Sequence, residues 1–334
     1  MKFSITLTFT ALFLGVAAAY YYWIPHLEHT SSETEPAQEA VSGTRLLPFD
    51  KDNPITWIQI QNIEKNFTVT LEKKDKDWQI KYPVADFADH RMAEGLVAAL
   101  KLSTRARRFK KEKGWNEYGL LRPEIKVGVG TADEARRYLY FGDPSPVGTD
   151  RFARWEGEPE YFLVKEELKR AFERSVYSMR RKEVFTLPMA QIEKIYLHTS
   201  SEDYEILKKE GEWFWTEPIP ILGTRLHKNQ TDEILSAVTH LYIKDFLDGE
   251  KPSLENAGLD GDAINLTLAA AKESQTLRVG RAIDEKDGFY AQAGESPNIV
   301  LMAQMNLRKL FEMIETMAKG AVSSQPSSVS PSES

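Results

Sequence analysis

The chain of 334 residues contains no cysteine. This absence excludes disulfides, thiol catalysis, thiolate metal sites and a lipid-modified N-terminal cysteine. An excess of positive charge is also missing: the formal net charge is −7, which argues against a general affinity for nucleic acid. Neither a Gly-x-Ser-x-Gly nor a His-Glu-x-x-His motif occurs, and the histidines are scattered. We therefore expect no catalytic residue, cofactor, metal site or nucleic-acid partner. The alternative is a hydrolase that uses a pair of carboxylates which no motif reveals.

The one long apolar run lies at the N-terminus. Residues 3–24 carry no charge, and at about 1.5 Å per residue they would extend roughly 33 Å, enough to cross a hydrocarbon core of about 30 Å. The run ends in an aromatic cluster typical of a membrane interface, Tyr20, Tyr21, Tyr22 and Trp23. Lys2 precedes it and acidic residues follow it, which predicts a cytoplasmic N-terminus. We expect a transmembrane anchor over residues 1–27; the alternative is a signal peptide cleaved near Ala19.

Two polar segments delimit the part of the chain that is expected to fold. Residues 28–47 are rich in Ser, Thr, Glu, Ala and Gln and are expected to form a linker. Residues 321–334 hold seven serines and two prolines and are expected to form a disordered tail. A folded region of residues 48–320 remains between them.

The folded region repeats itself. Apolar, Gly and Pro positions recur in the same order roughly 137 residues later, as in the pairs Ile58 and Ile195, Trp78 and Trp213, Pro83 and Pro218, Gly119 and Gly258, Gly142 and Gly280, and Phe172 and Phe311. A single pair means little, but a collinear series indicates duplication. We therefore predict an α+β fold with two tandem copies of an antiparallel-sheet-plus-helices unit, residues 48–185 and 186–320, after one N-terminal transmembrane helix.

Local patterns predict the elements of each copy. In the first copy, alternating apolar residues predict strands near residues 58–60, 67–71, 78–82, 126–129, 138–141, 151–155 and 161–164. Asp89 is expected to cap a helix with Leu96 and Leu100 on its apolar face, and another helix is expected from Lys165. In the second copy, Asn229 or Thr231 is expected to cap the corresponding helix. Most connections are too short for crossover helices, which favours antiparallel pairing. Gly128-Val129-Gly130 is expected to form a hairpin turn rather than a phosphate loop.

A basic stretch distinguishes the first copy from the second. It contains a single acid, Glu112, among seven basic residues: Lys101, Arg105, Arg107, Arg108, Lys110, Lys111 and Lys113. The corresponding residues 239–251 of the second copy carry more acidic than basic side chains. One interpretation is a contact with an acidic partner, an anionic lipid or a charged glycan. The other is a solvated strand edge, where Lys and Arg discourage edge-to-edge pairing.

Two tryptophans, Trp115 and Trp155, have no aromatic counterpart in the second copy. As exposed rings they would be able to stack on a sugar; the alternative is that they belong to the core. Together with the seven basic residues they make up a candidate interaction patch. The two copies share apolar positions and turns but almost no polar constellation, which favours a binding or structural role over catalysis.

Several short motifs carry a family pattern. They are the turn Tyr118-Gly119-Leu120 with Pro123 and its counterpart Ala257-Gly258-Leu259, the segments from Trp78 to Pro83 and from Trp213 to Pro218, and the pair Phe141-Gly142. With these motifs the chain resembles the bacterial domain of unknown function 4340 family over about Ile55 to Lys319. In the second copy Asp262 stands where the first has a proline after Gly-Leu. The resemblance implies an exported, N-terminally anchored protein that accompanies ABC transport systems of the gliding-motility type, and it implies no catalytic residue.

These observations lead to one expected function and one alternative. We expect a non-enzymatic accessory or scaffold protein in the bacterial inner membrane, single-pass, with its N-terminus in the cytoplasm and its C-terminal domain in the periplasm. Its expected partner is an integral membrane or envelope protein such as an ABC transporter subunit. The alternative is a module that binds an envelope glycan or an anionic lipid.

Overall fold

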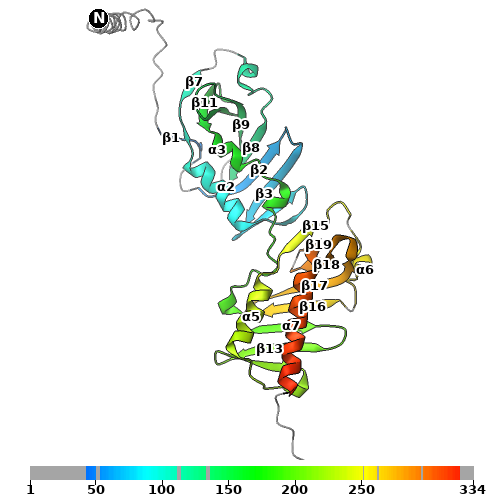
Figure 1. Cartoon of the computed structure of the whole chain (residues 1–334). Coiled ribbons are helices and arrows are strands. Elements are labelled where there is room, and N and C mark those ends of the chain that lie inside the picture. Colours follow the sequence, from blue (N-terminus) through cyan, green and yellow to red (C-terminus); the bar gives the residue numbers. More distant parts are fainter. Residues whose placement is uncertain are drawn as a thin grey trace, which may run out of the picture.

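The computed structural model describes residues 43–49, 53–110, 114–132, 136–250, 252–261, 263–294 and 296–323. The chain forms two lobes that follow one another (Figure 1), which we call the first half, up to residue 179, and the second half, from residue 185. The expected anchor of residues 1–27, most of the expected linker and the tail from residue 324 lie outside the described residues. Among the helices that are described, none is long and apolar enough to cross a membrane.

The first half is built on one large sheet. Its described strands lie in the spatial order β5 (Asp86–Phe87), β4 (Asp77–Tyr82), β3 (Phe67–Lys74), β2 (Ile55–Asn62), β8 (Ile125–Thr131), β9 (Arg137–Pro144), β10 (Asp150–Trp155), β11 (Glu160–Lys165) and β7 (Arg108–Lys110). A small second sheet pairs β1 (Thr44–Arg45) with β6 (Thr104–Arg105). The helical elements are α2 (His90–Leu102), η1 (Trp115–Tyr118), α3 (Glu166–Ala171) and α4 (Val176–Met179).

The second half also has one large sheet. Its described strands lie in the order β14 (Glu212–Glu217), β13 (Asp203–Lys209), β12 (Lys194–His198), β16 (Ile264–Ala269), β17 (Ser274–Ile283), β18 (Gly288–Ala293), β19 (Ile299–Ala303) and β15 (Ile243–Phe246). The helical elements are η2 (Met189–Gln191), η3 (Ile219–Ile221), α5 (Lys228–Thr239), α6 (Leu254–Ala257), η4 (Asp284–Lys286) and α7 (Gln304–Ser323).

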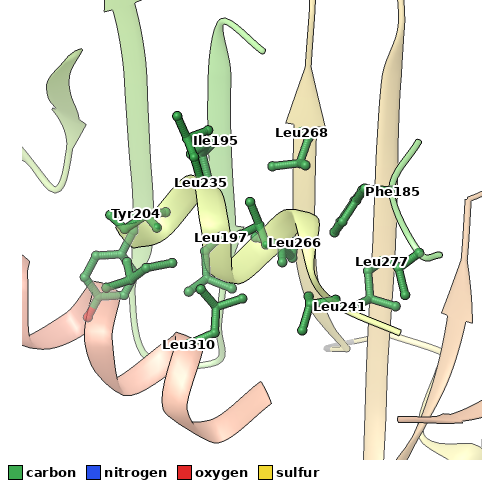
Figure 2. Close-up of a cluster of buried hydrophobic side chains, with 14 of the residues drawn as sticks. Phe185, Ile195, Leu197, Tyr204, Leu235, Leu241, Leu266, Leu268, Leu277 and Leu310 are labelled. Atoms are coloured by element: carbon green, nitrogen blue, oxygen red, sulfur yellow. The ribbon is translucent and has the colours of Figure 1, made fainter. Parts of the chain in front are cut away.

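In each half the longer helices pack on one face of the large sheet. Side chains alternate between the two faces of a strand, so in β2 Ile58 and Ile60 are fully buried while Gln59 between them is only partly covered. In the first half α2 closes this core with Leu96 and Leu100. Figure 2 shows the equivalent layer of the second half, where Leu235 of α5 and Leu310 of α7 meet Leu197, Leu266 and Leu268 from the strands.

The expected α+β class with antiparallel sheets is confirmed, because the described strand pairs are all antiparallel and helices are present in both halves. Asp89 caps α2 as predicted, accepting a hydrogen bond from the Met92 amide at 2.9 Å. The predicted cap of α5 is wrong. This helix begins after His227, and Thr231 lies inside it, where its hydroxyl donates to the His227 carbonyl.

Three further expectations need correction. Leu46 and Leu47, assigned to the linker, are buried because β1 pairs with β6 and the Leu46 carbonyl accepts from the Trp155 indole. Gly128 and Gly130 form no hairpin turn but lie inside β8, paired with β2. Residues 321–323 of the expected tail continue α7.

A short extended segment, residues 180–184, joins the halves by pairing with both. Towards the first half, the Asp89 amide donates to the Met179 carbonyl at 2.8 Å, and the Arg181 amide donates to the Phe87 carbonyl at 3.0 Å. Towards the second half, the Val184 amide donates to the Leu241 carbonyl at 3.2 Å, and the Ile243 amide donates to the Lys182 carbonyl at 2.8 Å. The segment therefore acts as a strand shared by the two lobes.

One buried cation holds this junction. Arg180 is 1% exposed and forms ion pairs with Asp86 of the first half and Asp248 of the second. Its guanidinium also lies 3.6 Å from the ring centroid of Phe246. Asp86 accepts a further hydrogen bond from Ser296, at 3.1 Å. A buried charge is tolerated only when it is paired, so both halves contribute to one network.

We predict that Arg180→Leu lowers the free energy of unfolding by about 3 kcal/mol, because it leaves the buried Asp86 carboxylate without its cation. Urea denaturation measures the loss. Arg91→Leu is the matched control: Arg91 pairs with Glu183 across the same junction, but its side chain is 82% exposed, so the loss should stay below about 1 kcal/mol. Equal stability of wild type and Arg180→Leu would contradict the role assigned to this network.

Candidate functional site

The sheet of the first half has an outer face, the side turned away from α2 and α3, and a row of facing side chains crosses it. Register places Gln61 of β2 opposite Lys126 of β8, Lys126 opposite Tyr140 of β9, and Tyr140 opposite Arg154 of β10. Directly facing residues on one side of a sheet are close enough to interact. The alternation of side chains along four strands therefore brings cations and aromatic rings together.

The cations of this row lie over aromatic rings. The Arg154 guanidinium is 4.5 Å from the Tyr140 ring and 4.7 Å from the Trp115 ring. The Lys126 ammonium is 4.3 Å from the Tyr138 ring and 5.1 Å from the Tyr140 ring. Each contact is worth about 0.5–1 kcal/mol at an exposed site and more when water is excluded.

Trp57 extends this arrangement beside the row. Arg136 lies 4.1 Å above its ring, and Tyr138 meets the ring edge-on at a centroid distance of 6.1 Å. Gly128 makes room for this packing, because a Cβ there would lie 2.7 Å from both Trp57 and Tyr138. The glycine that sequence analysis assigned to a turn is therefore needed inside the strand.

An aromatic cluster ends the row at the edge of the sheet. Tyr161 of β11 stacks on Phe109 of β7 and on Tyr118 of η1, with centroid distances of 5.0 and 4.4 Å. Trp115 meets Tyr161 edge-on at 6.2 Å. The η1 turn ends at Gly119, whose φ of +65° favours glycine. This turn lays Trp115 and Tyr118 against the rings of the neighbouring strands.

One carboxylate, Glu156, belongs to the row. It accepts a short hydrogen bond from the Tyr140 hydroxyl and lies 3.2 Å from the Lys126 ammonium. The bond from Tyr140 is the main cause that lowers the pKa of Glu156, and Lys126 adds to it. Burial and the same bond raise the pKa of Tyr140. Burial disfavours the charge of Lys126, but its hydrogen bonds to Tyr140 and Glu156 outweigh this and raise its pKa.

Arg154 differs from Lys126 in having no acceptor. No described carboxylate or carbonyl accepts a hydrogen bond from its guanidinium, and its Nε is buried without a partner. Burial lowers the pKa of Arg154, yet a guanidinium keeps its charge in a protein. Arg154 is thus a half-buried cation that is held by two rings and still offers its donors.

The structure divides the predicted interaction patch. Trp155 is fully buried in the core, so the core alternative holds for it, while Trp115 joins the outer face. Arg105 is half-buried over Phe162. Arg108 and Lys110 flank Phe109 in β7 and therefore point to the opposite side of the sheet from it. Lys101 and Arg107 are exposed, and Lys111 and Lys113 lie outside the described residues.

A second group of charges lies near the helix-covered face, and its members pair with one another. Arg151, 4% exposed, pairs with Glu124 at 3.1 Å and Glu166 at 2.7 Å. Lys169 pairs with the same Glu124 at 2.6 Å and with Glu173 at 2.7 Å. Because every cation here has two carboxylates, this network ties α3 to the sheet and leaves no unpaired group for chemistry.

A cavity of about 660 Å³ lies between the halves. Its apolar lining residues include Pro83, Val84 and Ala85 from the first half and Leu247, Pro252 and Leu254 from the second. Among its polar lining residues, Asp248 is already paired with Arg180 and Asn298 donates to the Ala85 carbonyl. In the part of the chain that the structure describes, no cluster of three His, Cys, Asp or Glu side chains is suitably placed to bind a metal.

Sequence reasoning missed Lys126, Arg136, Tyr138, Tyr140 and Arg154. Except for Arg136, which precedes β9, they alternate with apolar residues within the predicted strands, but a single strand does not tell which strands are neighbours. Only the order β8, β9, β10 brings Lys126, Tyr140 and Arg154 into one row, with Arg136 and Tyr138 beside it.

Gly128→Ala should lower the free energy of unfolding by about 1–3 kcal/mol, because its Cβ would overlap the Trp57 and Tyr138 rings and force them to shift. Urea denaturation and near-ultraviolet circular dichroism measure stability and ring packing. Gly95→Ala is the control, since a Cβ on this residue of α2 meets no atom within 4 Å and should stabilise the helix by up to about 1 kcal/mol. A neutral Gly128→Ala would contradict the packing described here.

The lowered pKa of Glu156 predicts a pH effect. Its charged form is favoured by folding, so this stabilisation is complete above the ordinary value of 4.5 and is lost as the pH falls through the lowered pKa. Melting temperatures of wild type and Glu156→Gln, recorded between about pH 3 and pH 6, should therefore converge at the acidic end. Glu233→Gln, which removes an exposed carboxylate of α5, should keep the wild-type profile. A constant difference between wild type and Glu156→Gln across this range would refute the assignment.

Comparison with known proteins gives one match. A family model described as "Domain of unknown function (DUF4340)" matches residues 78–261, which is more than half of the chain. The match begins at Trp78 in β4 and includes β8, β9 and β10 as well as the junction. Searches of curated proteins and of solved structures gave no match.

Proposed function

Since the chain belongs to the DUF4340 family, we propose that it is a non-enzymatic accessory or scaffold protein of the bacterial inner membrane, whose first half binds an envelope partner. The N-terminal apolar run would anchor it, with the folded part in the periplasm. An ABC transporter permease is the kind of partner that the family resemblance implies. The observation that carries the proposal is the difference between the outer faces of the two halves.

The two halves are, in this proposal, tandem copies of one unit. The spatial order β4-β3-β2-β8-β9-β10-β11-β7 corresponds strand by strand to β14-β13-β12-β16-β17-β18-β19-β15. Two glycine positions support the correspondence. A Cβ on Gly142 would meet the Tyr118 carbonyl at 2.1 Å, and one on Gly280 would meet the Ala257 carbonyl at 2.0 Å. Both glycines thus allow a strand to touch the turn that precedes the sheet's middle strands.

The outer faces of the two halves differ in chemistry. In the second half, the row that corresponds to Lys126, Tyr140 and Arg154 consists of Asn265, Arg278 and Gln292. It contains no aromatic side chain, and its one cation, Arg278, donates to the Leu259 carbonyl. A shared scaffold needs only the matched core positions. Outside this row, the second half does place a cation near an outer ring, with Lys194 5.6 Å from Tyr196. The aromatic and cationic side chains of the row in the first half are therefore the best candidates for a function that the second half lacks.

A binding role fits this surface better than catalysis. Aromatic and Arg side chains are enriched where proteins bind one another. The carboxylates near the row are engaged: Glu156 with Tyr140 and Lys126, and Glu158 with Arg137 at 2.6 Å. A general acid or base must instead be able to exchange its proton with a substrate.

Photocrosslinking in living cells tests the proposal. A photoreactive phenylalanine analogue is placed at Tyr118 or Thr68, on the outer face of the first half, and at Tyr196 or Thr267, on the corresponding face of the second. Crosslinks to one defined membrane protein should form from the first pair and be at least several-fold weaker from the second. Mass spectrometry identifies the partner.

The same variants separate the alternatives. Equal crosslinking from both halves, or none from Tyr118 and Thr68, would reject the first half as the binding region. Crosslinks from Tyr118 or Thr68 to phospholipid alone would favour the anionic-lipid alternative. Crosslinks from these positions to envelope glycan alone would favour the glycan alternative.

A further inference from the structure

The contacts on the outer face decide which ligand chemistry it can accept. Sugar binding by stacking needs a free aromatic face. Here Arg136 lies over Trp57, Lys126 lies over Tyr138, and Arg154 lies over both Trp115 and Tyr140. The groups that remain available are the hydrogen-bond donors of the cations, so recognition by charge is favoured over recognition by stacking.

Arg154 is the cation best placed for such recognition. Its ring contacts at 4.5 and 4.7 Å restrict the side chain without consuming its donors. A guanidinium that is held in position loses little freedom when it forms hydrogen bonds, and its planar fork matches a carboxylate with two parallel bonds. The neighbouring Lys126, by contrast, already has Glu156 as a partner.

The surroundings of Arg154 also favour an anion. The row and its neighbour Trp57 bring together three cations, Lys126, Arg136 and Arg154, with Glu156 as the carboxylate bonded into the row. Arg136 is exposed and has no ion pair with a described residue. Complementary charge across an interface increases the association rate and suppresses wrong partners.

We propose that Arg154 is the anchor of this surface and that the partner protein presents an Asp or Glu carboxylate to it from an acidic segment. The inference rests on the proposed function and deepens it by naming the chemistry of the partner. A protein carboxylate is favoured over a lipid headgroup because Lys126, Arg136 and Arg154 are spread across the outer face of neighbouring strands, which suits an extended protein surface. It is favoured over a neutral glycan because the ring faces are occupied.

The crosslinking experiment is repeated with Arg154→Gln, Arg154→Lys and Arg308→Gln in the full-length chain. Arg308 is the matched control, an exposed arginine of α7 whose guanidinium lies 5.9 Å from the Phe289 ring. Arg154→Gln should reduce the Tyr118 crosslink about tenfold, as expected for the loss of a charge-assisted bond. Arg154→Lys should lose less, because it keeps the charge, and Arg308→Gln should behave as wild type. Mapping of the crosslinked peptide should place Asp or Glu residues of the partner at the contact.

A binding assay with defined probes supplies the second test. Full-length protein in nanodiscs of neutral lipid is titrated with poly-L-glutamate, polygalacturonate and phosphatidylglycerol vesicles. Poly-L-glutamate should bind most tightly, and Arg154→Gln should weaken it about tenfold. Tighter binding of polygalacturonate or of the vesicles would overturn the assignment of a protein carboxylate. Circular dichroism and melting temperatures show whether each variant is folded. If Arg154→Gln is not folded, Arg154→Lys takes its place in the test.

The two proposals fail in different ways. Absence of a crosslink from wild-type Tyr118 and Thr68 would reject the proposed function itself. A wild-type crosslink that Arg154→Gln leaves unchanged, or that Arg308→Gln reduces equally, would reject only the role of Arg154.

Discussion

In the part of the chain that the structure describes, the longer helices cover one face of each large sheet, and the chemistry of the other face follows from that constraint. A strand in the middle of such a sheet must present apolar side chains to the core and water-compatible ones to the outside. In the first half, Tyr138 and Tyr140 are nevertheless large rings on the outer side. Lys126 and Arg154 help to make this possible, because the charged end of each side chain lies over a ring and is attracted to it. The cations therefore stabilise the face and also give it its charge.

In the second half, the corresponding row meets the same constraint with polar side chains. Asn265, Arg278 and Gln292 occupy the corresponding row, and Thr267 bonds with Thr276 across neighbouring strands at 2.8 Å. This solution needs no aromatic ring and leaves no cation without an acceptor in the row. Both faces are compatible with water, so solubility alone does not require the aromatic rings of the first half. The outer face of the second half also has a ring with a cation near it, Tyr196 with Lys194 at 5.6 Å, but not in the corresponding row. The combination of rings and cations in the row of the first half is the reason to connect that row with binding.

The junction determines how the outer face of the first half is presented. Residues 180–184 bond to both lobes, and Arg180 joins Asp86 and Asp248 in a buried network. Such a network is costly to disrupt once one partner is lost, so the second half holds the first in a defined orientation. In an anchored protein, a fixed orientation would reduce the entropy lost on binding a membrane partner.

Local features were predictable from sequence because they depend on neighbouring residues. Asp89 before an apolar stripe indicated the start of α2, and the alternation in residues 67–71 indicated β3. The α5 cap was missed because His227 lacks the short side chain usually found at this position. Instead, the side-chain oxygen of Gln230 accepts a hydrogen bond from the His227 backbone amide. Leu46 was assigned to a linker because a two-residue strand leaves almost no pattern, although its pairing with β6 buries the side chain that follows.

The candidate site was harder to predict because it depends on strand order. The basic stretch is contiguous in sequence, yet strand alternation separates its members: Arg108 and Lys110 leave β7 on one side, and Phe109 leaves it on the other. At the end of the sheet, these two cations fit the role of discouraging further strand pairing. The cations that face aromatic rings, Lys126 and Arg154, come instead from β8 and β10, far apart in sequence. The candidate binding surface of the first half is therefore not the basic run along the chain but the row across the sheet. In that row, each side chain is positioned by its neighbours on adjacent strands.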